Sequence, residues 1–343
     1  MPDVREQETA LFVDPIAPLR LALRGHYEIE RQIGQGAFAT VYLAQDLKHE
    51  RKVAIKVLNA DPTSETSELR FIREIRVLAR LQHPNILPLH DSGHVEALLY
   101  YVMPYVKGET LRERIDRQRQ LATDDAACIA KEVADALASA HAQGIVHRDI
   151  KPENILLSGG HAIVADFGIA RAIDLAGIRS LTRTGVGSPG TPAYMSPEQL
   201  LGDPQIDTRS DLYSLGCVLY EMLIGKPPFF GKDGFVKRFT EAPPLASRAR
   251  HEIPEWLDAI VAKALARNPA ERYPGASELV SALTLGLSLE QSNPRGIPVY
   301  PSPRVETASA HADHQNVDPV SGAPFKSTAR ESHADEPLSL IHI

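Results

Sequence analysis

The sequence is poor in cysteine, in long apolar runs and in excess basic charge. Only two cysteines occur among its 343 residues, Cys128 and Cys217, and both stand in apolar, helix-like contexts. We therefore expect two buried structural thiols in a reducing compartment and no disulfide framework. No window of the sequence reaches the roughly 18 uncharged apolar residues that a membrane span needs. A formal net charge of -7 argues against nucleic-acid binding, whose footprint is a basic stripe.

The N-terminal residues do not resemble a secretory signal. Asp3, Glu6 and Glu8 stand where such a signal is basic, and prolines and an arginine interrupt the apolar stretch 11–23. We expect residues 1–25 to be a leader whose amphipathic end packs on the following lobe. These features together predict a cytoplasmic protein.

Residues 26–103 alternate apolar and polar side chains as β-strands do. Such short runs, separated by glycine and polar turns, predict five strands, at 27–30, 40–44, 52–56, 86–89 and 98–102. Apolar residues at helical spacing predict one helix over 67–81, which Pro84 stops. The first lobe is thus predicted to be a five-stranded antiparallel sheet with one helix.

Residues 104–286 carry helical periodicity instead. Thr123 is expected to cap a helix that ends near Gly144, where a left-handed residue belongs. Later apolar segments predict helices at 210–224 and 254–266. The fold class is therefore α+β, with a small sheet-bearing lobe and a larger, mainly helical lobe.

The last part of the sequence, 287–343, has no periodicity and is rich in Pro, Ser, Ala and His. This composition predicts a disordered tail. The apolar ending 338–343 is untypical of such a tail, so we expect a truncated or spurious end of the reading frame.

Two features of the first lobe suit phosphate binding. Gly34 and Gly36 lie between two predicted strands, where their backbone can close over phosphates as a hairpin lid but offers no helix N-terminus to a dinucleotide. Lys56 ends an apolar strand and needs a partner, for which Glu74 on the predicted helix is the candidate. Taken alone, the glycines are also ordinary turn residues and the lysine could reach solvent.

The most informative run extends from His147 to Asn154 and is followed by Asp166-Phe167-Gly168. Two acidic residues, an amide and a lysine at this spacing suit a site that holds metal-bound triphosphate and aims a hydroxyl at it. The second lobe is therefore predicted to carry the chemistry.

In this order, the motifs resemble those of protein kinases, and especially the eukaryotic-like serine/threonine kinases of bacteria. The resemblance covers about residues 25–285. The residues that carry it are the glycine loop, Val53-Ala54-Ile55-Lys56, Glu74, the 147–154 run, Asp166-Phe167-Gly168, the 190–198 segment, Asp211 and Arg272. It implies the two-lobed kinase fold over 26–286, divided into lobes at 26–103 and 104–286.

The resemblance implies a role for each catalytic residue. Asp149 would orient the acceptor hydroxyl or accept its proton, and Lys151 would neutralise charge on the transferring γ-phosphoryl. Lys56, held by Glu74, would grip the α- and β-phosphates of ATP. Thr191 would bridge toward Asp149 and Lys151. The presence of both Thr191 and Lys151 favours Ser/Thr over Tyr acceptors.

Cofactor binding follows from the same resemblance. Asn154 and Asp166 would hold two Mg²⁺ ions, or Mn²⁺ in their place. The expected ATP-binding residues are Ile33, Gly34, Gly36, Val41, Ala54, Lys56, Met103, Tyr105, Val106 and Leu156. Four apolar or aromatic residues would stack between the lobes: Leu78, Leu89, His147 and Phe167.

Other residues are expected to be structural or regulatory. Glu198 and Arg272 would form a buried ion pair, and Asp211 would fix the catalytic-loop backbone. Arg148 would receive a phosphate from Thr182 or Thr184 after autophosphorylation, the alternative being a mobile polar loop without a regulatory role.

The implied function is a non-specific serine/threonine protein kinase that acts on protein substrates, itself included. Two alternatives stay open on the residues: a catalytically silent scaffold of the same fold, and a small-molecule phosphotransferase. A scaffold is expected to have lost Lys56, Asp149, Asn154 or Asp166, and none is lost. The resemblance also makes a homodimer through the small lobe an option. Three departures from the family pattern are Ala39, Ser196 and Ser188-Pro189.

Overall fold

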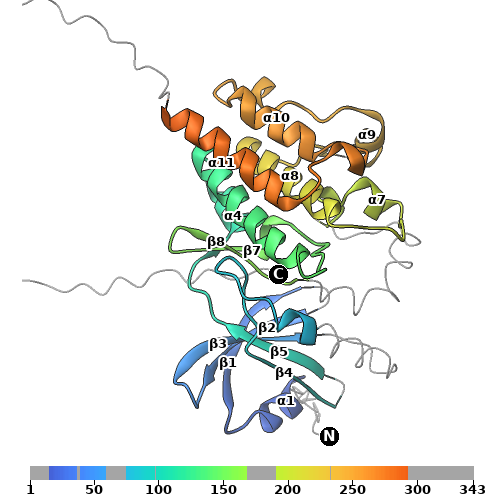
Figure 1. Ribbon diagram of the computed structural model, residues 1–343. Helices are drawn as coiled ribbons and strands as arrows, with labels where there is room; N and C mark the ends of the chain where they lie inside the picture. Colours follow the sequence, from blue (N-terminus) through green and yellow to red (C-terminus); the bar gives the residue numbers. More distant parts are fainter. Residues whose placement is uncertain are drawn as a thin grey trace, which may run out of the picture.

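The protein has two lobes joined by a short linker (Figure 1). The computed structural model describes residues 15–36, 39–58, 75–96, 98–167, 191–231 and 233–292. In the small lobe, a five-stranded antiparallel sheet has the order β1-β2-β3-β5-β4. Its strands are β1 (Tyr27–Gln35), β2 (Ala39–Asp46), β3 (Arg51–Leu58), β4 (Asp91–Val95) and β5 (Leu98–Pro104). The predicted fold class is confirmed.

One predicted strand is wrong. The apolar run 86–89 is not the fourth strand, which lies at Asp91–Val95. Instead, Leu87 N donates to Val164 O at 2.9 Å, Val164 N donates to Asn85 O at 2.8 Å, and Asn85 Nδ2 donates to Ala162 O at 2.7 Å. This segment is apolar because it packs between the lobes and pairs with the large lobe, which the alternation of one strand cannot reveal.

Each face of the small-lobe sheet is covered. Helix α1 (Ala17–Ala22) lies on one face, where Ile16, Leu19 and Leu23 pack with Tyr42 and Ile55. The end of the leader therefore packs on the first lobe, as predicted. The other face carries a second apolar cluster and is turned toward the large lobe (Figure 1).

The large lobe is mainly helical and is built around α8. Every residue of α8 from Ser210 to Leu223 is buried, and the helix packs on α4 and α10. The helices are α3 (Leu111–Gln118), α4 (Thr123–His141), α7 (Pro197–Leu200), α8 (Arg209–Ile224), α9 (Gly234–Thr240), α10 (Glu255–Ala264) and α11 (Ala276–Ser292). A small sheet of β6 (Glu109–Thr110), β7 (Ile155–Ser158) and β8 (His161–Val164) faces the small lobe. The described part of this lobe also contains short 3-10 turns at η1 (Pro152–Asn154), η2 (Thr191–Ala193), η3 (Ala246–Arg248) and η4 (Pro269–Glu271).

Several local expectations are corrected. Ala122 occupies the cap position of α4 and Thr123 is its first helical residue, although Gly144 is left-handed with φ 75° as expected. Helix α11 continues to Ser292, into the stretch assigned to the tail. Cys217 is buried, but Cys128 is exposed because it lies on the solvent side of α4. None of the helices in the described ranges is both long and apolar enough to cross a membrane.

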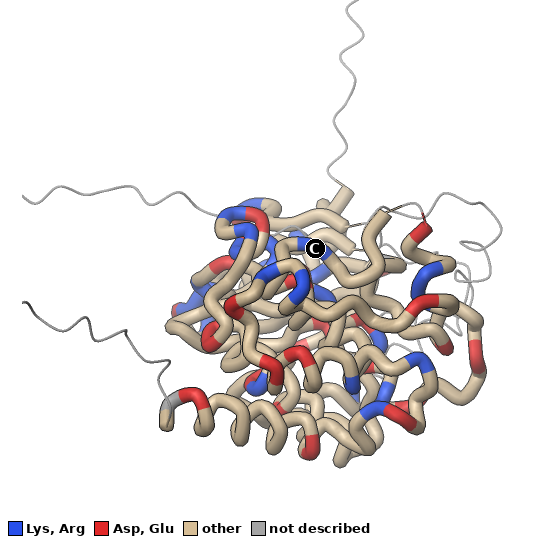
Figure 2. Tube along the Cα trace, turned by 90° about the horizontal axis from the view of Figure 1, so that it is seen from above, with Lys and Arg blue, Asp and Glu red and all other residues tan. Residues whose placement is uncertain are grey.

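Basic and acidic residues both occur along much of the described trace (Figure 2). Figure 2 shows basic and acidic residues interspersed along the chain rather than segregated.

Candidate active site

The loop that carries Asp149 is anchored to the core by one carboxylate of α8. Asp211 is fully buried and accepts from the backbone N–H of His147 at 2.8 Å and of Arg148 at 2.7 Å. Its Oδ2 also lies 2.8 Å from His141 Nε2. Arg148 has φ 70°, a conformation that non-glycine residues rarely adopt. Asp211 thus holds the backbone in a strained turn just before Asp149.

Asp149, Lys151 and Asn154 form one hydrogen-bonded group. Lys151 Nζ lies 2.7 Å from Asp149 Oδ2, and Asn154 Nδ2 donates to the same oxygen at 3.1 Å and to Asp149 O at 2.8 Å. Burial would lower the pKa of Lys151, but the carboxylates of Asp149, Glu153 and Asp166 outweigh it and the pKa is raised. Lys151 therefore carries its positive charge next to Asp149.

Asn154 is oriented so that one polar atom is left over. Its Nδ2 is used by Asp149, while Oδ1 is buried and has no hydrogen-bond partner among the described residues. A buried amide oxygen without a partner is costly unless something else binds it. Because hard cations such as Mg²⁺ prefer oxygen ligands, this oxygen fits a metal ligand.

Asp166 follows β8 and is held from the small lobe. Lys56 Nζ lies 2.5 Å from its Oδ2, and the Tyr101 hydroxyl donates to its Oδ1 at 2.7 Å. Burial would raise the pKa of Asp166, but Lys56 and Tyr101 outweigh it, so the pKa is lowered and the carboxylate stays ionised. Asp166 also has φ 63°, a second strained position in this loop region.

The expected nucleotide-binding residues gather between the lobes. Ile33, Val41, Ala54 and Met103 belong to one apolar cluster, on the face of the sheet that is turned toward the large lobe, with Tyr105 packed against it. Gly34 stands opposite Val41 in the β1–β2 ladder, and Gly36 N donates to Ala39 O at 2.8 Å. Val106 follows Tyr105 in the linker, and Leu156 is buried on β7 in the large lobe.

The residues expected to stack between the lobes also meet. The rings of His147 and Phe167 have centroids 4.6 Å apart. Leu78, Leu89 and Phe167 line one small pocket, together with Met103 and Tyr101. Asp166 also lines this mainly apolar pocket.

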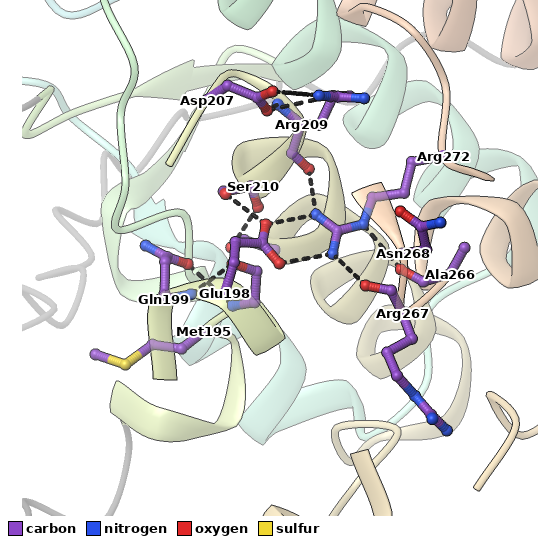
Figure 3. Close-up of polar contacts among 12 residues, drawn as sticks. Met195, Glu198, Gln199, Asp207, Arg209, Ser210, Ala266, Arg267, Asn268 and Arg272 are labelled. Atoms are coloured by element: carbon purple, nitrogen blue, oxygen red, sulfur yellow. Dashed lines mark hydrogen bonds and ion pairs between the residues drawn. The ribbon is translucent and has the colours of Figure 1, made fainter. Parts of the chain in front are cut away.

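Glu198 and Arg272 form a buried, two-pronged ion pair (Figure 3). Arg272 donates to Glu198 Oε1 at 2.6 Å and to Oε2 at 2.8 Å, and Ser210 Oγ donates to Oε1 at 2.5 Å. The remaining donors of Arg272 reach the carbonyls of Ala266, Arg267 and Arg209. This pair joins the segment after residue 190 to the far end of the lobe.

A second charged network, beside the catalytic loop, has no signature in the sequence motifs. Arg112 on α3 donates to Glu153 Oε1 at 3.0 Å, to Glu221 Oε1 at 3.0 Å and to the Tyr194 hydroxyl, which in turn donates to Glu221 Oε2 at 2.5 Å. Burial would lower the pKa of Arg112, but the interaction with Glu221 outweighs burial, so the pKa is raised. The partners are far apart in sequence, so no local pattern could have predicted them.

Some predicted site residues lie outside the described residues. These are Glu74, expected to pair with Lys56, together with Gly168, Thr182, Thr184 and Ser188-Pro189. Thr191 begins the 3-10 turn η2, but its side chain is not described.

This fold and this arrangement of lysine, aspartates and asparagine define a protein kinase. The chain belongs to the protein kinase domain family, whose model matches residues 27–282. Among curated proteins, it is similar to the serine/threonine-protein kinase PknB of Mycobacterium tuberculosis, with 44% identity over 266 residues that cover 75% of this chain and 42% of the relative.

Two further relatives give a similar picture. A probable serine/threonine-protein kinase PknB of Bifidobacterium longum is 42% identical over 268 residues, covering 74% of this chain and 38% of that protein. A probable serine/threonine-protein kinase of Streptomyces coelicolor is 42% identical over 266 residues, covering 75% and 39%. The chain therefore spans less than half the length of these relatives.

Proposed function

We propose that this chain is a serine/threonine protein kinase that transfers the γ-phosphoryl group of ATP to hydroxyl groups of proteins. The observation that carries the proposal is the convergence of Lys56, Asp149, Lys151, Asn154 and Asp166 at one face between the lobes. Positioning and electrostatic stabilisation are what phosphoryl transfer demands of a protein, and these groups supply both.

Each residue has a role that its environment supports. Asp149 orients the acceptor hydroxyl, and the charged Lys151 beside it stabilises negative charge on the transferring group. Lys56 binds ATP phosphates from the small lobe. Asn154 and Asp166 would hold divalent cations, which when bound neutralise charge on the phosphates. The orphaned Oδ1 of Asn154 and the ionised carboxylate of Asp166 support this choice of ligands.

The acceptor class rests on Lys151 and on the relatives. A lysine two residues after the catalytic aspartate is the pattern of Ser/Thr kinases in this family. The similar proteins of Mycobacterium tuberculosis and Bifidobacterium longum carry serine/threonine-protein kinase in their names. We therefore favour serine and threonine over tyrosine as acceptors.

Regulation by autophosphorylation is part of the proposal. A phosphate on Thr182 or Thr184 would bring about -1.5 to -2 charge to the segment and pair with Arg148. The backbone of Arg148 is fixed on both sides, by Asp211 and by Gln199 Nε2 at 2.7 Å from its carbonyl, which supports a preorganised receiver. Phosphopeptide mapping of active protein should find at least one of the two threonines modified. Active protein with both unmodified would refute this regulation.

Labelled ATP separates the proposed function from a silent scaffold. Purified protein with Mg²⁺ should incorporate label, and Asp149→Asn should keep nucleotide binding while losing phosphoryl transfer almost completely. Asp124→Asn makes the same change on the exposed first turn of α4 and serves as the matched control. Nucleotide binding without any transfer by the wild-type protein would favour the scaffold. Label found only on small molecules would favour a small-molecule phosphotransferase.

A further inference from the structure

Tyr101 shares a sheet face with the lysine of the active site. In the β3–β5 ladder, Lys56 and Tyr101 stand directly opposite each other. Residues paired in this way on antiparallel strands point to the same side, with their Cβ atoms about 5 Å apart. Both side chains are buried, and both end on Asp166: Nζ of Lys56 at Oδ2 and the hydroxyl of Tyr101 at Oδ1. The sheet register therefore places two donors on one carboxylate.

The surroundings of Asp166 make the hydroxyl hard to replace. Asp166 borders a pocket whose other walls include Leu78, Met103 and Phe167. In such apolar surroundings a carboxylate oxygen that loses its donor pays its desolvation cost without compensation.

A hydrogen bond from Tyr101 does not consume the oxygen that accepts it. Each carboxylate oxygen has two lone-pair positions, so Oδ1 can accept from a hydroxyl and still bind a cation. What the hydroxyl does is fix the rotation of the carboxylate, since Lys56 alone holds only one oxygen. Donors of this kind behind a ligating group typically change metal affinity by about 10–100-fold when removed.

We propose that Tyr101 is a positioning residue of the active site, whose hydroxyl orients Asp166 for binding the divalent cation that accompanies ATP. The inference rests on the proposed role of Asp166 as a metal ligand. It assigns to Tyr101 a task that ordinary core packing of its ring does not require.

The test compares two tyrosines of the same strand. Tyr101→Phe removes the hydroxyl beside Asp166. Tyr100→Phe makes the same change one residue earlier, where the side chain is also buried but packs on the opposite face of the sheet. Mn²⁺ binding is followed by electron paramagnetic resonance in the presence of a saturating non-hydrolysable ATP analogue. The affinity for the analogue alone is measured in EDTA.

Tyr101→Phe should bind Mn²⁺ about 10-fold more weakly, and its affinity for the metal-free analogue should change less than about twofold. Tyr100→Phe should match the wild type in both measurements. Equal loss of metal-free binding in Tyr101→Phe would mean that the pocket itself is damaged, which contradicts the proposal. Tighter Mn²⁺ binding would mean that the hydroxyl competes with the metal, and this too would overturn it.

Asp166→Ala separates failure of this inference from failure of the proposed function. If Asp166→Ala abolishes Mn²⁺ binding while Tyr101→Phe leaves it intact, only the role of Tyr101 is refuted. If Asp166→Ala binds Mn²⁺ normally, the proposed metal ligand itself is wrong.

A second measurement avoids any loss of folding in Tyr101→Phe. Fluorotyrosine placed at position 101 of the otherwise wild-type protein should give a fluorine resonance that shifts when Mg²⁺ is added with the analogue. The shift should vanish in the Asp166→Ala background. A resonance that ignores Mg²⁺ would refute the proposal.

Discussion

Replacing Glu198 by glutamine should destabilise the large lobe by about 3 kcal/mol at neutral pH. Burial would raise the pKa of Glu198, but hydrogen bonds from Arg272 and Ser210 outweigh it and lower the pKa from its ordinary 4.5 to about 2. That difference in pKa between folded and unfolded chains sets the magnitude, and loss of one partner of a buried pair costs a similar 3–5 kcal/mol or so. The amide nitrogen of glutamine would also face an Arg272 donor at one of the two contacts (Figure 3).

The pH dependence of this effect has a definite sign. Because the folded-state pKa of Glu198 is the lower one, its contribution is fully present above about pH 4.5 and is lost as the pH falls toward 2. The stability difference between wild type and Glu198→Gln should therefore be largest near neutrality. It should stay constant from pH 7 down to about pH 4.5 and narrow as the pH falls from there toward 2.

Urea unfolding followed by circular dichroism measures the effect through the midpoint, provided that the slope is unchanged. Asp207→Asn is the control, because Asp207 pairs with Arg209 close by but its side chain is 44% exposed, against 10% for Glu198 (Figure 3). Its replacement should cost less than about 1 kcal/mol. Equal losses for both variants, or a Glu198→Gln loss that does not depend on pH, would refute the reasoning from burial.

Three further outcomes follow from local geometry. In urea titrations, Gly225→Ala should lower the free energy of unfolding by more than Gly144→Ala does. Both glycines have positive φ, which alone costs an alanine about 1–2 kcal/mol. A Cβ at position 225 would in addition lie 2.5 Å from the backbone oxygen of Arg119, whereas a Cβ at position 144 would meet no atom within 4 Å. Equal losses would show that the contact relaxes freely. A thiol reagent at pH 8 should modify exposed Cys128 in the native protein and Cys217 only after unfolding, since Cys217 is buried and burial raises its pKa to about 12. Mass spectrometry identifies the modified cysteine, and modification of Cys217 before Cys128 would contradict the prediction. Urea unfolding of protein modified only at Cys128 should give the wild-type midpoint, because that thiol packs no core.

Short-range patterns in the sequence were sufficient to predict most of the fold. The alternation of residues 40–44 and 52–56 predicted two strands that the structure contains, and the buried run 210–224 predicted α8 to within one residue of its start. The run 86–89 was mistaken for a strand because apolar residues look alike whether they pair within a sheet or pack between lobes. The periodicity of apolar residues indicates that a segment is buried, but it does not indicate which segment it packs against.

The candidate site was predicted from sequence motifs, and residues that belong to no motif were not predicted. Tyr101 could not be found because its importance depends on the β3–β5 register, which sets it opposite Lys56. Arg112 was missed for a related reason, since its partner Glu221 lies 109 positions away. Contacts that depend on tertiary pairing leave no trace in local spacing.

The segment 86–89 also has a mechanical consequence. The lobes are joined covalently by the linker after Pro104. They are also joined by the hydrogen bonds from Asn85 and Leu87 to β8. Release of the bonds from Lys56 and Tyr101 to Asp166 would leave the linker and the 85–87 segment as ties, and the lobes could then rotate about the line through these two. Opening of the nucleotide cleft should then be a rotation of the small lobe about this line, in which Gly36, far from the line, moves much more than Val164, which lies close to it.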